Sequence, residues 1–143
     1  MPAPPPFVAP EQHRATPVAG QLTGGWTNVF WFSWAAVAGS WAAIWASSRT
    51  TGLSTWWLGP EADPANVFLN LLPFVAPLAL AVAGLGRARF LPWWGVGGAL
   101  VQGAIAVGDL DGPGNYGLIQ LAVAVGAMAV SVASFGGMYR RAR

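Results

Sequence analysis

The chain has 143 residues, of which 55% are hydrophobic and only 8% are charged. A soluble domain carries roughly a quarter charged residues, so this composition excludes an ordinary water-facing surface and favours a bilayer as the solvent. The net charge of +2 comes from Arg residues placed singly or in pairs, which excludes the clustered cations of a nucleic-acid interface, and the absence of Cys excludes disulfides and thiol chemistry.

The first segment, residues 1–25, is rich in proline, with six Pro among its first seventeen positions. Such a segment cannot bury enough apolar surface to offset its ordering entropy, so we expect a disordered tail with local polyproline II character. No positively charged stretch leads into a short apolar run, which argues against a signal peptide. The remaining residues, 26–143, are expected to form one transmembrane domain.

Four long stretches without charge follow the tail. Trimmed at their polar ends, they predict spans near residues 26–47, 65–86, 91–109 and 116–138, each close to the roughly 20 residues that cross a bilayer. The fold class that we expect is therefore all-α, an integral membrane four-helix antiparallel bundle with a disordered N-terminal tail. The third span is short and rich in Gly, so a re-entrant segment is the alternative there.

Residues at the span ends have the chemistry of helix caps and of a membrane interface. Asp63 followed by Pro64 predicts the start of the second span, Pro92 lies in the first turn of the third, and Asn115 is placed to cap the fourth. Trp and Tyr prefer the headgroup level. Seven of them are expected there: Trp26, Trp56, Trp57, Trp93, Trp94, Tyr116 and Tyr139.

The Arg residues are distributed unevenly over the segments outside the spans. The tail, the second connection and the C-terminal segment carry six of them, whereas the first and third connections carry only Arg49. Because Arg near span ends in short loops is retained on the cytoplasmic side, we expect a multi-pass protein of the plasma (inner) membrane with both termini in the cytoplasm.

The first span contains Trp31, Trp34, Trp41 and Trp45, which, with Ala38, repeat at spacings of 3, 4, 3 and 4. This repeat places the four indoles on one stripe of a helix. We expect the stripe to contact other helices, because indole N–H groups within a membrane need acceptors. The alternative is a wall that stacks against a flat apolar ligand such as a quinone or a pigment.

The second span carries Asn66, Asn70, Pro73 and Pro77 on one stripe. The two prolines lack donors, so they free carbonyls near residues 69 and 73 and bend the helix. The stripe predicts a kinked helix whose polar groups bond to neighbouring spans. The alternative is coordination of a cation or a substrate, as in the broken helices of transporters.

Two glutamines complete the set of intramembrane polar residues. Gln102 and Gln120 are costly if they face lipid, so we expect both to point inward and to bond to each other or to Asn70. Small residues at four-residue spacing are expected to allow close helix packing; they are Gly95, Ala99 and Gly103 in the third span and Ala122 and Gly126 in the fourth.

The third connection, residues 109–115, begins with Asp109 and Asp111 and resembles part of a calcium loop. A Pro at the fifth position and Gln120 at the twelfth favour a plain acidic hairpin instead.

Catalytic chemistry has little support in the chain. The one His, His13, lies in the tail, and no Ser/His/Asp set, carboxylate pair or metal-ligand spacing is present. We therefore expect no enzyme, no cofactor and no bound metal. The sequence favours a non-catalytic accessory or scaffold subunit whose partners are the lipid bilayer and other membrane proteins or further copies of itself. The alternatives are a transporter or channel component that acts as an oligomer, and a binder of an apolar ligand.

Overall fold

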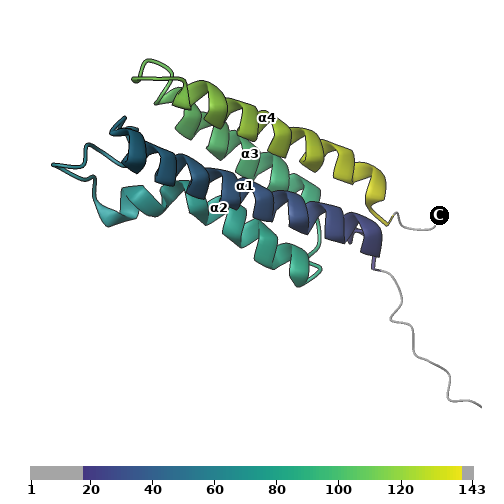
Figure 1. Cartoon of the computed structure of the whole chain (residues 1–143). Coiled ribbons are helices and arrows are strands. Elements are labelled where there is room, and N and C mark those ends of the chain that lie inside the picture. Colours follow the sequence, from purple (N-terminus) through teal and green to yellow (C-terminus); the bar gives the residue numbers. More distant parts are fainter. Residues whose placement is uncertain (1–17, 140–143) are drawn as a thin grey trace, which may run out of the picture.

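The computed structural model describes residues 18–139, and within this range the chain is helical. Four α-helices follow one another: α1 (Gly24–Thr51), α2 (Val67–Leu85), α3 (Leu91–Val107) and α4 (Tyr116–Ala133), and a short 3-10 helix, η1 (Ser134–Gly137), extends the last of them. They lie antiparallel in one bundle (Figure 1). No strand occurs in the described range beyond an isolated bridge between Leu22 and Met138, so the predicted all-α bundle is confirmed.

The bundle is built from two helical hairpins. The most extensive contacts join α1 to α2 and α3 to α4, whereas the seams between α2 and α3 and between α1 and α4 are looser. Both ends of the described chain lie at one end of the bundle, and the connections 52–66 and 108–115 lie at the other (Figure 1). We call these the terminal end and the loop end.

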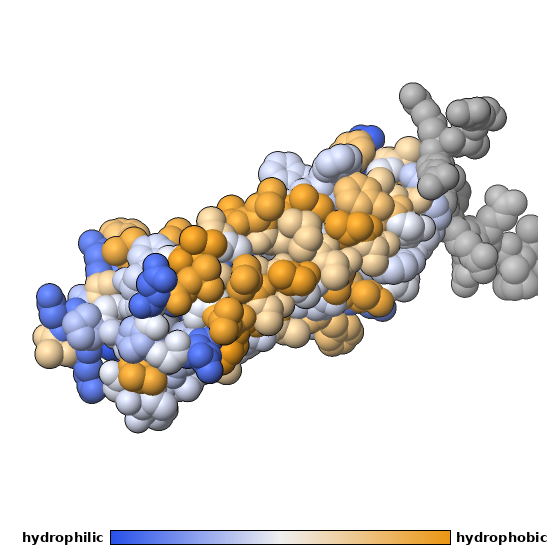
Figure 2. Space-filling view, turned by 90° about the horizontal axis from the view of Figure 1, so that it is seen from above, coloured by the Kyte–Doolittle hydropathy of each residue, from blue (hydrophilic) through white to orange (hydrophobic). Residues whose placement is uncertain are grey.

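The surface of the bundle is apolar along much of its length. Three helices, Gly24–Thr51, Val67–Leu85 and Tyr116–Gly137, are long and apolar enough to cross a membrane. Helix α3 has 17 residues, about 25 Å at roughly 1.5 Å per residue, so it is the shortest. Figure 2 shows hydrophobic surface along one side of the bundle, with hydrophilic residues gathered at the loop end.

The helix ends only partly follow the predicted caps. Helix α2 begins at Val67, and Asn66 is its cap, because the Asn66 side chain accepts a hydrogen bond from the Phe68 N–H at 3.0 Å. The prediction that Asp63 and Pro64 start this helix was wrong, since both residues remain in the preceding turn. Pro92 does lie in the first turn of α3, and Asn115 precedes α4 without a side-chain cap bond.

Backbone hydrogen bonds close the terminal end. The N–H of Gly20 donates to the carbonyl of Tyr139 at 3.0 Å, and the N–H of Tyr139 donates to the carbonyl of Gln21 at 2.9 Å. The turn between α2 and α3 joins them, because Phe90 N–H donates to Gly20 and the Gln21 side chain donates to the Arg87 carbonyl. Both ends of the described chain are therefore tied to this turn.

The long connection 52–66 folds back over the loop end. Trp57 and Leu58 are fully buried, so the Trp57 ring, which we expected at the membrane interface, packs against the chain's own side chains. Arg49 holds this connection from the last turn of α1, since its guanidinium donates to the carbonyls of Leu58 at 3.2 Å and Gly59 at 3.4 Å. This arginine, the one exception to the uneven distribution, thus has a structural role.

Glycines in α3 permit close packing on one side only. A Cβ at Gly98 would lie 2.5 Å from the Leu80 side chain and 3.1 Å from the Trp34 ring, and one at Gly95 would collide with Ser131. At Gly103 and Gly126, by contrast, a Cβ would meet nothing within 4 Å. These two glycines therefore take no part in close contacts between the helices of the bundle, and they leave open space on its outside.

Candidate functional site

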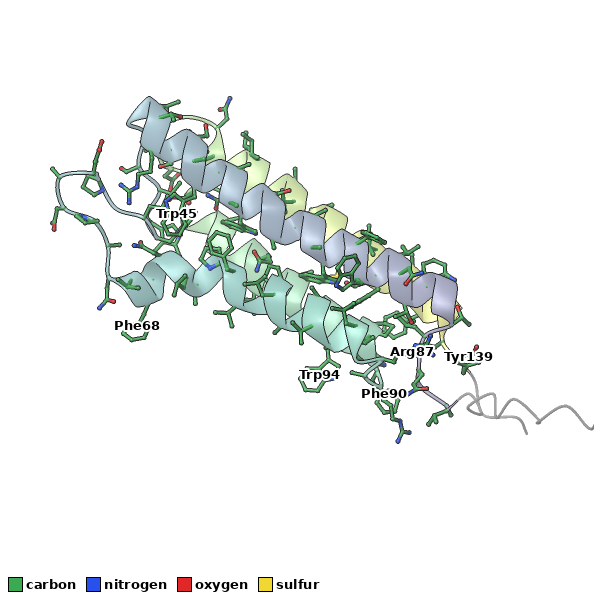
Figure 3. All side chains as sticks on the ribbon, turned by 60° about the horizontal axis from the view of Figure 1, so that its bottom comes forward. Trp45, Phe68, Arg87, Phe90, Trp94 and Tyr139 are labelled. Carbon is green, nitrogen blue, oxygen red and sulfur yellow. The ribbon has the colours of Figure 1, made fainter. Side chains whose placement is uncertain are left out.

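The tryptophan stripe of α1 lies against the rest of the bundle. Trp34 and Trp41 are buried, and Trp31 and Trp45 are half-buried beside the core. Trp41 and Trp45 meet the folded-back Trp57 edge to face, with ring centroids 5.6 Å and 6.1 Å apart. Together with Phe74 of α2 these rings form an aromatic cluster near the loop end, where Figure 3 labels Trp45.

Three buried indole N–H groups lack the acceptors that we expected. Those of Trp34, Trp41 and Trp57 are buried without a hydrogen-bond partner among the described residues. The expectation that such groups find acceptors was therefore wrong here. The indoles act as large apolar bodies whose packing and edge-to-face geometry offset the unmade bonds.

Helix α2 contains both prolines, and a side chain of α3 compensates for one of them. Pro77 has no N–H, so the carbonyl of Pro73 loses its usual partner one turn further on. The Gln102 side chain supplies the missing donor, since its Nε2 donates to the Pro73 carbonyl at 3.0 Å in the buried interior. The freed carbonyl expected near residue 73 is therefore the acceptor of an interhelical bond.

Gln120 takes part in a second buried connection, at the loop end. Its Nε2 donates to Oδ2 of Asp109 at 2.7 Å, and the other carboxyl oxygen of Asp109 accepts from the backbone N–H of Trp56 at 2.8 Å. Asp109 is only 5% exposed. One carboxyl group thus joins the end of α3, the first turns of α4 and the folded-back connection. The expected bond between Gln102 and Gln120 is absent, because each amide donates elsewhere.

Sequence reasoning missed the structural role of Asp109 and treated it as part of an acidic hairpin. A usable signal was present: Asp109 and Gln120 lie at equal distances in the sequence from the Gly114–Asn115 turn, so an antiparallel pair of helices brings them face to face. The calcium interpretation gains no support, since Asp109 already accepts two bonds and Asp111 is exposed. Among residues 18–139 no cluster of metal-ligating side chains forms.

The two asparagines of the predicted polar stripe form hydrogen bonds only with backbone groups close to them in the sequence. Asn66 caps its own helix, and the Nδ2 of Asn70 donates to the Ala65 carbonyl at 3.3 Å. Three amide oxygens are buried without a partner among the described residues: those of Asn70, Gln102 and Gln120. The interior therefore holds spare hydrogen-bond acceptors, enclosed within a single chain.

The outer side of α1 has a composition opposite to that of its buried stripe. Ala36, Gly39, Ala43 and Ala46 are all exposed and repeat at spacings of 3, 4 and 3. A Cβ at Gly39 would meet nothing within 4 Å. We call these four residues the small-residue stripe.

A shallow groove runs beside this stripe, along the loose seam between α1 and α4. It consists of two adjoining hollows of about 270 Å³ and 330 Å³, which share Ser40 and Val123 in their lining. Gly126 of α4 lines the first hollow, and Tyr116 lines the second, where its hydroxyl is 2.9 Å from that of Ser47. The seam is bordered on both helices by small side chains, which leave room for close approach of another helix.

Comparison with protein-family models, with curated proteins and with solved structures yields no match to this chain.

The bond between Gln102 and the Pro73 carbonyl generates a prediction about stability. Gln102→Leu leaves that carbonyl buried and unpaired, which should cost about 1–3 kcal/mol. In a Pro77→Ala background residue 77 regains an N–H that can donate to Pro73, so the same Leu substitution should cost less. A double-mutant cycle, measured by unfolding in detergent micelles, checks this coupling. Equal costs in the two backgrounds would contradict it.

Asp109 generates a second prediction. Asp109→Ala removes both acceptors at once and should destabilise the protein by about 2–4 kcal/mol, since it leaves the buried Gln120 amide and the part-buried Trp56 N–H without their acceptor. Asp109→Asn should be milder, because rotation of the Gln120 amide turns its spare oxygen toward the new amide. Asp111→Ala, in the same connection but exposed, is the matched control and should stay within about 0.5 kcal/mol. Thermal unfolding measures all three.

Proposed function

We propose that the protein is a non-catalytic, multi-pass membrane protein that works by association within the bilayer, as an accessory or scaffold subunit of a larger membrane assembly. The small-residue stripe on α1 carries this proposal. Its four members are exposed, and a Cβ at Gly39 would meet nothing within 4 Å.

The physical reason lies in how helices attract each other in lipid. Lipid tails are as apolar as a Leu side chain, so there is no hydrophobic driving force between helices in a bilayer. Association therefore depends on close van der Waals packing, which small residues permit. The spacing of Ala36, Gly39 and Ala43 is the spacing of a left-handed helix crossing. The groove beside them offers space for the side chains of a second helix.

The alternative functions receive less support from the geometry. Gln102 and Gln120 are fully buried within a single chain, so they do not line a transport path between copies of the chain. An apolar ligand on the tryptophan stripe would have to displace the chain's own packing, because Trp34 and Trp41 are covered by the other helices and by the folded-back connection.

We propose that the protein lies in the plasma membrane with its terminal end in the cytoplasm. Arg87 and Arg89 lie exposed at this end, whereas Glu61, Asp63 and Asp111 lie exposed at the loop end. Retention of Arg on the cytoplasmic side supports this assignment.

Association through α1 predicts position-specific crosslinks. A photoreactive residue at Ala43 should join the chain to one partner polypeptide in membranes, whereas the same residue at Val82, exposed on α2, should not. Gly39→Leu should remove the Ala43 adduct and weaken association by about 1–3 kcal/mol, because the added side chain overfills a close contact.

Gly103→Leu is the matched control for this experiment, since a Cβ at either glycine meets open space in the isolated bundle. It should leave the adduct intact. A chain that is monomeric in mild detergent, with no adduct at Ala43, would remove the proposal.

The orientation is tested by single cysteines, which this chain permits because it has none of its own. In intact cells a membrane-impermeant maleimide should label Asp111→Cys at the loop end and spare Tyr139→Cys at the terminal end until the membrane is opened. Labelling of Tyr139→Cys alone would reverse the proposed orientation.

A further inference from the structure

A second hollow lies on another side of the bundle, in the loose seam between α2 and α3. It holds about 510 Å³, and all of its lining residues are apolar in type. Its α2 wall is low because it carries Ala76 and Ala79, and its α3 wall is interrupted by Gly97, where a Cβ would meet nothing within 4 Å. We call it the α2–α3 groove. Its volume is in the range of about 300–1,000 Å³ that holds small molecules.

The length of the groove limits what it can hold. Along α3 it extends from Trp93 to Val101, about 12 Å at roughly 1.5 Å per residue. That distance is close to half of the roughly 30 Å of hydrocarbon in a bilayer. A helix that crosses the membrane would need a seam of twice this length, whereas a lipid chain from one leaflet needs no more.

Positive charge lies beyond the groove, in the turn at the terminal end of the bundle. Trp93 and Trp94 lie in the first turns of α3, and Arg87 and Arg89 precede them in the turn from α2, both exposed. Figure 3 shows Arg87, Phe90 and Trp94 gathered at the terminal end. Among residues 18–139 every acidic residue lies toward the loop end, so no carboxylate of this range lies beside these two arginines.

The two tryptophans suit the boundary between headgroups and chains. Trp93 and Trp94 are 64% and 66% exposed, and Trp93 is braced by an edge-to-face contact with Phe135 at 5.0 Å. Indoles settle at this level because the ring prefers hydrocarbon and its N–H prefers the polar ester region. They therefore mark where the apolar groove ends and the charged turn begins.

From these observations we propose that the α2–α3 groove binds one anionic phospholipid from the leaflet at the terminal end. One acyl chain lies along Gly97 between α2 and α3, and the phosphate lies against Arg87 and Arg89. Basic sites between transmembrane helices recognise anionic headgroups in this way, and guanidinium groups match the geometry of phosphate. The site lies on a different seam from the small-residue stripe and does not depend on the proposed association.

Native mass spectrometry of the full chain in detergent tests the site, with phosphatidylglycerol and phosphatidylcholine of identical chains as probes. The wild type should retain phosphatidylglycerol at least about fivefold better. Arg87→Gln with Arg89→Gln should weaken phosphatidylglycerol by about 25-fold, since each arginine near a phosphate is worth about a fivefold change. Phosphatidylcholine should weaken much less, because its own ammonium group already offsets the charge of its phosphate. Equal retention of the two lipids by the wild type would overturn the proposal.

The groove itself is tested by filling it. Gly97→Leu should reduce retention of both lipids, whereas Gly103→Leu, on the same helix but outside the groove, should retain them as the wild type does. If circular dichroism shows that Gly97→Leu has lost helix, Trp94→Ala replaces it, because this exposed ring contributes to the groove and not to the core. Unchanged retention in the groove variant, or equal loss in the Gly103 control, would count against the site.

A photoreactive residue at Val101, which lines the groove's inner end, distinguishes the occupant in intact cells. It should form adducts with phospholipid. An adduct with another polypeptide would overturn the lipid assignment in favour of a partner helix.

Discussion

A helix with two internal prolines can lie in hydrocarbon only if some other group bonds to the carbonyls that the prolines release, because lipid supplies no donor. In this protein the Gln102 amide donates to the carbonyl of Pro73. The bond fixes the depth at which α3 lies beside α2, at the level where Gly98 admits Leu80 and Trp34. The small side chains of Ala76 and Ala79 and the missing side chain at Gly97 then leave the α2–α3 groove open.

The two ends of the bundle are closed by different physical means. Side chains close the loop end: the carboxyl group of Asp109 joins three segments, Arg49 bonds to loop carbonyls and Trp57 fills the space above Trp41. The terminal end is closed by backbone bonds, chiefly those between Gly20 and Tyr139 and between Phe90 and Gly20. Substitutions at single positions should therefore disturb the loop end more than the terminal end.

The two faces of α1 carry side chains of different size. The large rings of Trp34 and Trp41 turn inward and are part of the core, whereas Ala36, Gly39 and Ala43 are exposed. The stripe of indoles is conspicuous in the sequence, but its rings pack within the chain's own fold. The surfaces on which we propose association or lipid binding carry small residues, which allow a neighbouring helix or a lipid chain to approach closely.

The sequence by itself determined the four helices and the apolar exterior, because long uncharged runs bounded by Arg, Asp and Pro have few other stable forms. It also indicated that the tryptophan stripe and the two glutamines would face inward, since period and polarity are local properties. The partners of those groups depended on tertiary structure. Register between α3 and α4 sets Gln120 opposite Asp109, the fold of the connection buries Trp57, and the proline at residue 77 selects a carbonyl for Gln102. Each of these depends on how separate segments pack against one another, which composition and periodicity do not specify.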